Sequence, residues 1–294
     1  SSYKLMNDIA LPALDAAAAT ALGINDYAAK GWKPLGNCDT GLTGTFDGNN
    51  HSITNLKIAR SDETCVGLFG STQGSGTIKN LGVVSAGISG NDIVGAIAGA
   101  AKGLLITHCS SAGNITAATD REGIGGIAGF LGARGQRGKV ISNCYSSCEV
   151  TANSTARSFI GGLVGASEGG IVINCYAAGR AGVSSGDENL RQRPGLVGNN
   201  ALGTGTITTC YATGGNGLAL NVISSLSIQG TVNNSYYPSG QVLNIFSNGG
   251  TAMPAGAARA NFVNFDFDNV WIWTDGQWPK LRNVPGTQPT VNLP

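Results

Sequence analysis

A glycine-bounded apolar motif recurs along this chain about every thirty residues, and no other feature constrains the fold as strongly. Its last glycine stands at positions 70, 99, 129, 165 and 198, which gives steps of 29, 30, 36 and 33 residues. A period of this length is typical of repeat proteins, in which each unit packs on its neighbours. The copies read VGLFG, VGAIAG, GGIAG, GGLVG and GLVG.

A second motif follows each copy. It reads TIKNLGVVSAG from Thr77, LITHCSSAG from Leu105, VISNCYSSC from Val140, VINCYAAG from Val172 and TITTCYATG from Thr206, with a degenerate TVNNSYYPSG from Thr231. Apolar runs of about four residues between Gly, Asn and Ser are too short for helices, and indicate buried strands joined by tight turns. One unit cannot bury its own apolar face, but copies stacked at about 4.8 Å can. The sequence therefore predicts an all-β fold, a right-handed parallel β-helix (β-solenoid) with capped ends.

Equivalent positions in successive coils of such a stack form ladders. The predicted apolar ladder is Ile78, Ile106, Ile141, Val172, Ile207 and Val232, and the predicted polar ladder at the bend is Asn80, His108, Asn143, Asn174, Thr209 and Asn234. Side-chain amides at a bend bond well along a stack of this kind. Both ladders are expected to run through the whole repeat region.

We expect one domain over residues 1–294, with four parts. Residues 1–31 should form an N-terminal strand and a helical cap lying across the first coil, because this segment is rich in helix formers. Residues 32–260 form the repeat coils. Residues 261–282 concentrate Phe and Trp and are expected to form a lid over the last coil, although a sugar-stacking platform is the alternative. Residues 283–294 should be a tail that serves as a linker or an assembly arm.

Composition narrows the function classes. Charged residues make up 12% of the chain and the formal net charge is +1, so no global field favours nucleic acid or an anionic membrane. Apolar stretches also fall well short of the roughly 20 residues of a membrane-spanning helix. We therefore expect no nucleic-acid partner and no membrane insertion.

The seven cysteines divide by position. Cys38 and Cys65 stand outside the ladders and are the best candidates for a disulfide that staples the first coil. Cysteines one coil apart point the same way and do not readily reach disulfide geometry, so Cys109, Cys144, Cys175 and Cys210 are interpreted as buried thiols. The sequence contains no Cys-x-x-Cys pair, so a zinc site is not expected.

The motifs contain few residues that are suited to catalysis. The two histidines, His51 and His108, lie in turn and ladder positions. Asp47, in FDGNN, is interpreted as a turn residue that holds backbone amides. We therefore predict a protein that is not an enzyme and uses no cofactor.

The pairing of GGLVG with INCYAAG, together with GTFDGNNHSITNLKI and the closing FDFDNVWIWTDGQWPKLR, resembles the GLUG-motif repeat family of secreted and surface bacterial proteins. The resemblance covers about residues 32–282. It implies an adhesin-like or stalk-like protein, secreted or on the bacterial cell surface. The motif also occurs beside the catalytic regions of immunoglobulin-cleaving metallopeptidases, but this chain has no His-Glu-x-x-His helix motif to hold zinc.

Charged residues gather in the variable segment before each glycine-apolar strand, where stacking would align them as a column of polar loops. The candidate ligand-binding residues are Arg157, Asp187, Glu188, Arg191 and Arg193, whose arginines suit an acidic glycan or a partner carboxylate. Simple solvation of surface loops is the alternative. The expected function is a non-catalytic structural or adhesive module whose partner is a surface glycan, a protein receptor or copies of itself in a fibre. The rivals are a carbohydrate-active β-helix enzyme, a polysaccharide-binding module and a flat-surface binder.

Overall fold

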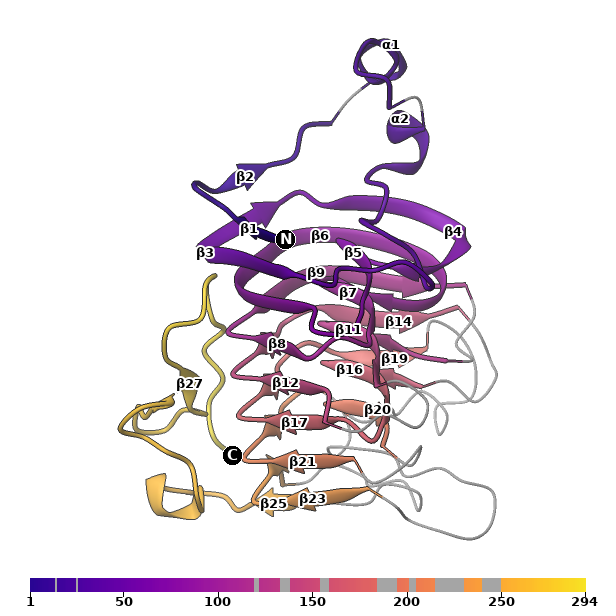
Figure 1. The fold of residues 1–294 in the computed structure, drawn as a ribbon. Helices are drawn as coiled ribbons and strands as arrows, with labels where there is room; N and C mark the ends of the chain where they lie inside the picture. Colours follow the sequence, from indigo (N-terminus) through magenta and orange to yellow (C-terminus); the bar gives the residue numbers. More distant parts are fainter. Residues whose placement is uncertain are drawn as a thin grey trace, which may run out of the picture.

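The chain folds into a stack of parallel β-coils (Figure 1). The computed structural model describes residues 1–13, 15–24, 26–118, 122–132, 138–153, 159–183, 195–200, 205–214, 230–239 and 250–294. Helical structure within these residues is short, namely α1 (Ala16–Ala21), α2 (Tyr27–Lys30) and the 3-10 turn η1 (Arg259–Asn261). The parallel β-solenoid predicted from the repeat period is confirmed.

A large parallel sheet follows most of the circumference of the coils. Its strands are β1 (Ser2–Lys4), β2 (Ile9–Ala10), β3 (Thr45–Thr54), β4 (Lys57–Val66), β6 (Thr77–Gly95), β8 (Leu105–Thr107), β9 (Ser110–Ala117), β10 (Ile124–Gly125), β12 (Val140–Ser142), β13 (Tyr145–Ser146), β14 (Glu149–Ala152), β15 (Ile160–Gly161), β17 (Ile171–Ile173), β18 (Tyr176–Ala177), β19 (Ala181–Val183), β21 (Thr206–Thr208), β22 (Tyr211–Ala212), β23 (Thr231–Asn233), β24 (Tyr236–Pro238) and β25 (Thr251–Met253).

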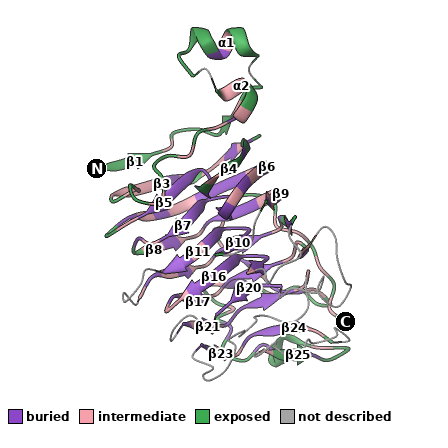
Figure 2. Cartoon of the chain, turned by 90° about the vertical axis from the view of Figure 1, so that its right-hand side faces the viewer, coloured by how far each residue is buried: buried purple, intermediate pink, exposed green. Residues whose placement is uncertain are grey.

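A second parallel sheet closes the other side of the coils, one strand per coil. Its strands are β5 (Phe69–Thr72), β7 (Ala98–Ala101), β11 (Ala128–Gly132), β16 (Val164–Glu168) and β20 (Val197–Asn199). These strands contain the ends of the glycine-apolar motifs. Almost all residues of the five strands are buried (Figure 2). About five coils therefore stack through this sheet.

The apolar ladder predicted from the sequence runs through the interior. The parallel register pairs Ile78 with Ile106, Ile106 with Ile141, and so on down to Val232. Ile78, Ile141 and Ile207 are fully buried. Each ladder side chain thus packs between its copies in the coils above and below.

The polar ladder marks a bend of the backbone. Its six residues all have a positive φ, between 44° and 53°. This left-handed conformation is easiest for Asn among residues with a side chain, which explains why Asn fills four of the six positions. The bend turns the chain from one strand of the large sheet into the next.

The glycines of the repeat are required by close backbone approach. A Cβ added to Gly165 would lie 2.1 Å from the backbone nitrogen of Ile124, and one added to Gly129 would lie 2.5 Å from that of Val94. The backbone of the preceding coil therefore lies directly against these glycines. This contact is the physical reason for the last glycine of the motif.

The N-terminal segment adds a further layer and a helical projection. Strands β1 and β2 pair in parallel with β3. Asp15 caps α1 by accepting a hydrogen bond from the Ala18 amide at 2.8 Å. Helix α2 packs on β4 and α1 packs on α2, so this helical arm (α1 and α2) stands above the coils instead of lying across the first one (Figure 1).

The aromatic C-terminal segment packs differently from the predicted lid. Residues 259–294, here called the strap, contain the antiparallel pair β26 (Trp271–Ile272) and β27 (Lys280–Leu281) and run along the side of the solenoid (Figure 1). Their aromatic side chains cover a stack of tyrosines on the outside of four successive coils, Tyr145, Tyr176, Tyr211 and Tyr236. The aromatic residues of the expected lid therefore pack along the side of the coils, where the outward-facing tyrosine rings provide an apolar surface.

Candidate functional site

The predicted ligand-binding residues Arg157, Asp187, Glu188, Arg191 and Arg193 lie outside the residues that the structure describes. The column of polar loops that they would form stays a prediction.

Asp92 and Glu122 are charged residues of these variable segments that the structure describes, and Asp92 does not face the solvent. The side chain of Asp92 is buried, and its Oδ1 accepts hydrogen bonds from the amides of Ile93 at 3.0 Å and of Glu122 at 3.1 Å. Glu122 belongs to the next coil. Asp92 thus links two coils and offers no carboxylate to a ligand.

The structure joins Cys38 to Cys65 by a disulfide, with 5.4 Å between the Cα atoms. Cys65 is the buried next-to-last residue of β4, whereas Cys38 lies in the loop between Leu35 and Leu42. This loop bridges in parallel to β5 at both of its ends. The disulfide therefore fixes a loop that lies on top of the second sheet.

The remaining cysteines are buried free thiols, including the ladder set Cys109, Cys144, Cys175 and Cys210. The backbone amides of Cys109, Cys144 and Cys175 each donate to the cysteine sulfur of the following coil, as in the 3.4 Å contact from Cys109 N to Cys144 Sγ. The Cys210 amide donates instead to the Ser235 hydroxyl at 3.0 Å. Burial raises the pKa of the Cys109 and Cys175 thiols, so both stay protonated at neutral pH. They pack as small apolar groups and are poor nucleophiles.

The outward face of the large sheet mixes hydroxyl and aliphatic side chains. One row along the solenoid is Thr77, Leu105, Val140, Ile171, Thr206 and Thr231. Such a row is not the unbroken threonine ladder that a flat-surface binder would present. This face therefore gives no support to that rival.

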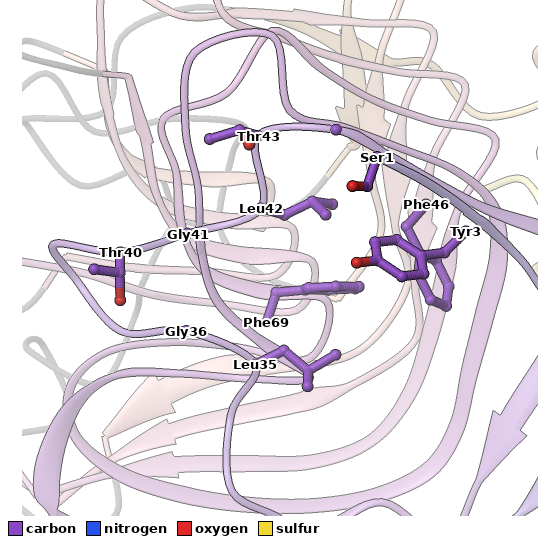
Figure 3. A pocket seen from close by; sticks show the side chains of 11 residues that line it. Ser1, Tyr3, Leu35, Gly36, Thr40, Gly41, Leu42, Thr43, Phe46 and Phe69 are labelled. Carbon is purple, nitrogen blue, oxygen red and sulfur yellow. The ribbon is translucent and has the colours of Figure 1, made fainter.

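A cavity of about 500 Å³ opens at the N-terminal end of the solenoid (Figure 3). Its lining is mainly apolar and comes from Ser1, Tyr3, Leu35, Gly36, Thr40, Gly41, Leu42, Thr43, Gly44, Phe46 and Phe69. Phe46 and Phe69 pack edge to face, with ring centroids 5.1 Å apart, and form its floor. The cavity is therefore the open end of the solenoid interior.

The cavity lies at the top layer, on which the structure describes no further strand. Tyr3 pairs with Phe46, which pairs with Ile78, so Tyr3 occupies the same interior ladder one coil higher. Tyr3 is nevertheless 57% exposed, and Leu35, which bridges to Phe69, is 44% exposed. Six of the nine large apolar side chains that are exposed in the described residues belong to the first 35 residues. This concentration indicates an interaction surface.

Sequence reasoning missed this end of the molecule. Residues 1–43 supply the strand and loop of an extra coil, but the helical arm interrupts them, so the thirty-residue period is not visible there. The signal that was available is the alternation in SSYKL, where Tyr3 takes the ladder position.

A buried arginine holds the helical arm on the first coils. Arg60 is 1% exposed, and its guanidinium donates to Asp26 at 2.8 Å, to Glu63 at 2.8 Å and to the Trp32 carbonyl at 3.0 Å. The hydrogen bond from Arg60 lowers the pKa of Asp26. Asp26 precedes α2 directly, so this ion pair sets the position of the arm beside the cavity.

Metal and membrane features are absent from the part of the chain that the structure describes. No three His, Cys, Asp or Glu side chains there come together as a metal site. None of the helices described is long and apolar enough to span a bilayer.

Comparison with known proteins adds two findings. An alignment 158 residues long is 33% identical to halomucin from Haloquadratum walsbyi, and it covers 46% of this chain and 2% of halomucin. The fold matches the crystal structure of a "putative immunoglobulin A1 protease" from Bacteroides ovatus, with a TM-score of 0.65 and 21% identity over 96% of this chain and 86% of that one. At this identity the second match shows a shared β-helical fold. No family model matches the sequence.

Proposed function

We propose that this chain is a non-catalytic structural or adhesive module of a secreted or cell-surface bacterial protein, in keeping with its resemblance to GLUG-motif repeats. The observation that carries the proposal is the combination of a rigid laddered solenoid with a halomucin-like sequence. Similarity to halomucin favours a surface or secreted protein, and the match spans only a small part of halomucin. A rigid scaffold of stacked coils suits the display of variable loops.

The proposed adhesive residues are the loop arginines Arg157, Arg191 and Arg193, with Asp187 and Glu188 beside them in sequence. Their partner is an acidic glycan or a carboxylate-bearing receptor. The test measures binding of the purified protein to a glycan array and to host cells. Changing the three arginines to alanine should abolish binding.

A matched control removes the same amount of charge elsewhere. Lys33, Lys57 and Arg180 are exposed, and their joint change to alanine should leave binding intact. Equal loss in both triple variants would mean that only overall charge matters, and the assignment of the loops would be wrong. Circular dichroism of both variants verifies the fold.

The second candidate is catalysis, and two observations favour a test. The structural neighbour carries a protease name, and parallel β-helices also host polysaccharide-degrading enzymes. Incubation of the purified protein with immunoglobulin A1 and with acidic polysaccharides, in the presence of divalent metals, should yield no new fragments or reducing ends. Time-dependent cleavage would overturn the non-catalytic proposal.

A further inference from the structure

We propose that the N-terminal edge of the solenoid binds an extended peptide strand of a partner protein. The strand would add to β1 and β2 in parallel and place an apolar side chain in the 500 Å³ cavity. This mode of recognition is β-augmentation, in which main-chain hydrogen bonds give affinity and a side-chain pocket gives specificity.

The first argument is the free edge of the large sheet. Strands β1 and β2 pair with β3 on one side, and all their residues are exposed. The Thr45 amide donates to the Ser1 carbonyl at 3.1 Å, and the Leu5 amide donates to the Asp47 carbonyl at 2.9 Å. Backbone groups alternate in direction along a parallel strand, so Ser2 and Lys4 direct theirs away from β3. An edge of this kind is a template for another strand.

The second argument is continuity with the coil-on-coil interface. The interior ladder runs without a break from Val232 to Tyr3, and each member below Tyr3 is covered by the next. A residue placed above Tyr3 would face the cavity lined by Leu35, Leu42 and Phe69. The cavity walls are thus ready for an apolar side chain from one more strand.

The third argument decides between a strand and a second copy. Helices α1 and α2 rise above the level of β1 and β2 at the same end of the molecule (Figures 1 and 2). A second solenoid stacked coil on coil would meet this arm. A single strand that follows β1 and β2 along the opposite side does not meet it.

A peptide copied from the chain itself provides a matched probe. Residues 76–84, GTIKNLGVV, pair in parallel with β3 through Thr77 and Val83, and β1 and β2 pair with the same strand from the other side. The peptide should therefore reach β1 and β2 in the same register, with its isoleucine above Tyr3. Fluorescence anisotropy of the labelled peptide with the full chain should show saturable binding. The same peptide with aspartate in place of this isoleucine should bind at least about tenfold more weakly.

Two variants of the protein test the edge and the cavity separately. Lys4→Pro removes an outward amide without disturbing β1–β3 pairing, and Leu35→Lys places a charge at the cavity mouth. Each should weaken peptide binding at least about tenfold. The controls are Lys4→Ala, which keeps the amide, and Leu104→Lys, which changes an exposed leucine on another face. Both controls should bind within about twofold of the parent chain.

Three outcomes would overturn the proposal. The first is a failure of the parent chain to bind the peptide saturably. The second is equal binding by Lys4→Pro, Leu35→Lys and their controls. The third is concentration-dependent self-association in light scattering that Lys4→Pro abolishes, because this result would identify a second copy as the occupant.

Discussion

At the scale of single residues, this fold depends on positions where a close contact or the backbone conformation restricts which amino acid can stand there. Gly129 and Gly165 contact the backbone of the preceding coil, and the bend ladder holds its residues at positive φ. These positions explain why glycine and asparagine recur while the residues around them vary. The recurring glycines and asparagines of the motif are thus explained by these backbone constraints.

Replacing Gly165 with alanine should destabilise the protein strongly. The added methyl group would overlap the backbone nitrogen of Ile124, and a backbone contact cannot move aside as a side chain can. We expect a loss of at least about 3 kcal/mol in the free energy of unfolding, measured by urea denaturation.

The matched control for this change is Gly87→Ala. Gly87 is exposed, and an added Cβ would meet nothing within 4 Å. Its free energy of unfolding should stay within about 1 kcal/mol of the parent. Equal stability of the two variants would contradict the close approach at Gly165.

At the scale of elements, each strand is stable because it lies between two copies of itself. The interior is therefore built from ladders, which join into one continuous apolar cluster along the stack. The helical arm is the exception, since it is held mainly by α2 and the Arg60 ion pairs. Substitutions in a ladder should therefore affect the unfolding of the coils, whereas substitutions at the arm should affect amide exchange in α2.

Replacing Ile141 with aspartate should unfold the middle coils. Ile141 is fully buried and pairs with Ile106 and Val172, so the carboxylate would have no partner between two apolar neighbours. We expect a loss of several kcal/mol, at least about 4 in magnitude. Thermal unfolding followed by circular dichroism measures the change, and an unaltered midpoint would mean that this side chain does not face the interior.

The arm should loosen in acid. Arg60 lowers the pKa of Asp26, so the ion pair contributes stability above the unfolded carboxyl pKa of about 4, and this contribution is lost as pH falls through the lower folded pKa. Asp26→Asn should therefore speed amide exchange in α2 at pH 7 by about fivefold, and the difference from the parent should vanish in strong acid.

An exposed ion pair on the same arm serves as the control. Asp62 meets Lys30 at 2.9 Å with 68% of its side chain exposed, so Asp62→Asn should change exchange in α2 much less. Exchange that is equally fast in both variants would show that the buried guanidinium does not position the arm.

Periodicity made the repeat coils predictable, but not their two ends. The interior ladder and the bend at Asn143 follow from equivalent positions, each repeated one coil away. The strap has no such copies. Its contacts join residues far apart in sequence, as between Ser110 and Pro285, and no local pattern encodes them. The candidate arginines fall in variable loops, where periodicity predicts a location but no geometry.

At the scale of the whole molecule, the strap connects coils that would otherwise contact only their neighbours. Stacked rings of Tyr145, Tyr176 and Tyr211 lie 5.1 and 4.7 Å apart, and strap side chains cover them. The segment predicted to be a linker or an assembly arm also packs here, because the Pro285 carbonyl accepts hydrogen bonds from Ser110 and Tyr145. Several coils should therefore unfold together.

The stability of the protein at high pH should test whether the strap buries the tyrosine stack. Burial raises the pKa of Tyr176 and Tyr211, so the folded state favours the neutral phenols, and stability is lost as pH rises above the unfolded value of about 10. Tyr211→Phe removes a hydrogen bond to the Pro279 carbonyl and should cost about 1 kcal/mol at pH 7. Because phenylalanine cannot ionise, this deficit should shrink above pH 10.

Denaturant unfolding at several pH values measures this difference. Tyr3→Phe removes an exposed phenol. The free energy of unfolding of this control variant should equal that of the parent at every pH. A deficit for Tyr211→Phe that stays constant through pH 11 would contradict the burial of this ring under the strap.

The surface module proposed above would be pulled as well as bound, and the strap determines how this chain would carry load. Tension applied at Pro294 acts first on the strap, which is attached along the tyrosine stack by separate hydrogen bonds, such as those of Tyr176 to Gln288 and Tyr211 to Pro279. These attachments would break one after another, like a strip being peeled, before any coil is sheared from its neighbour. The chain would lengthen and dissipate work at low force, while the stacked coils and whatever they hold stay in place.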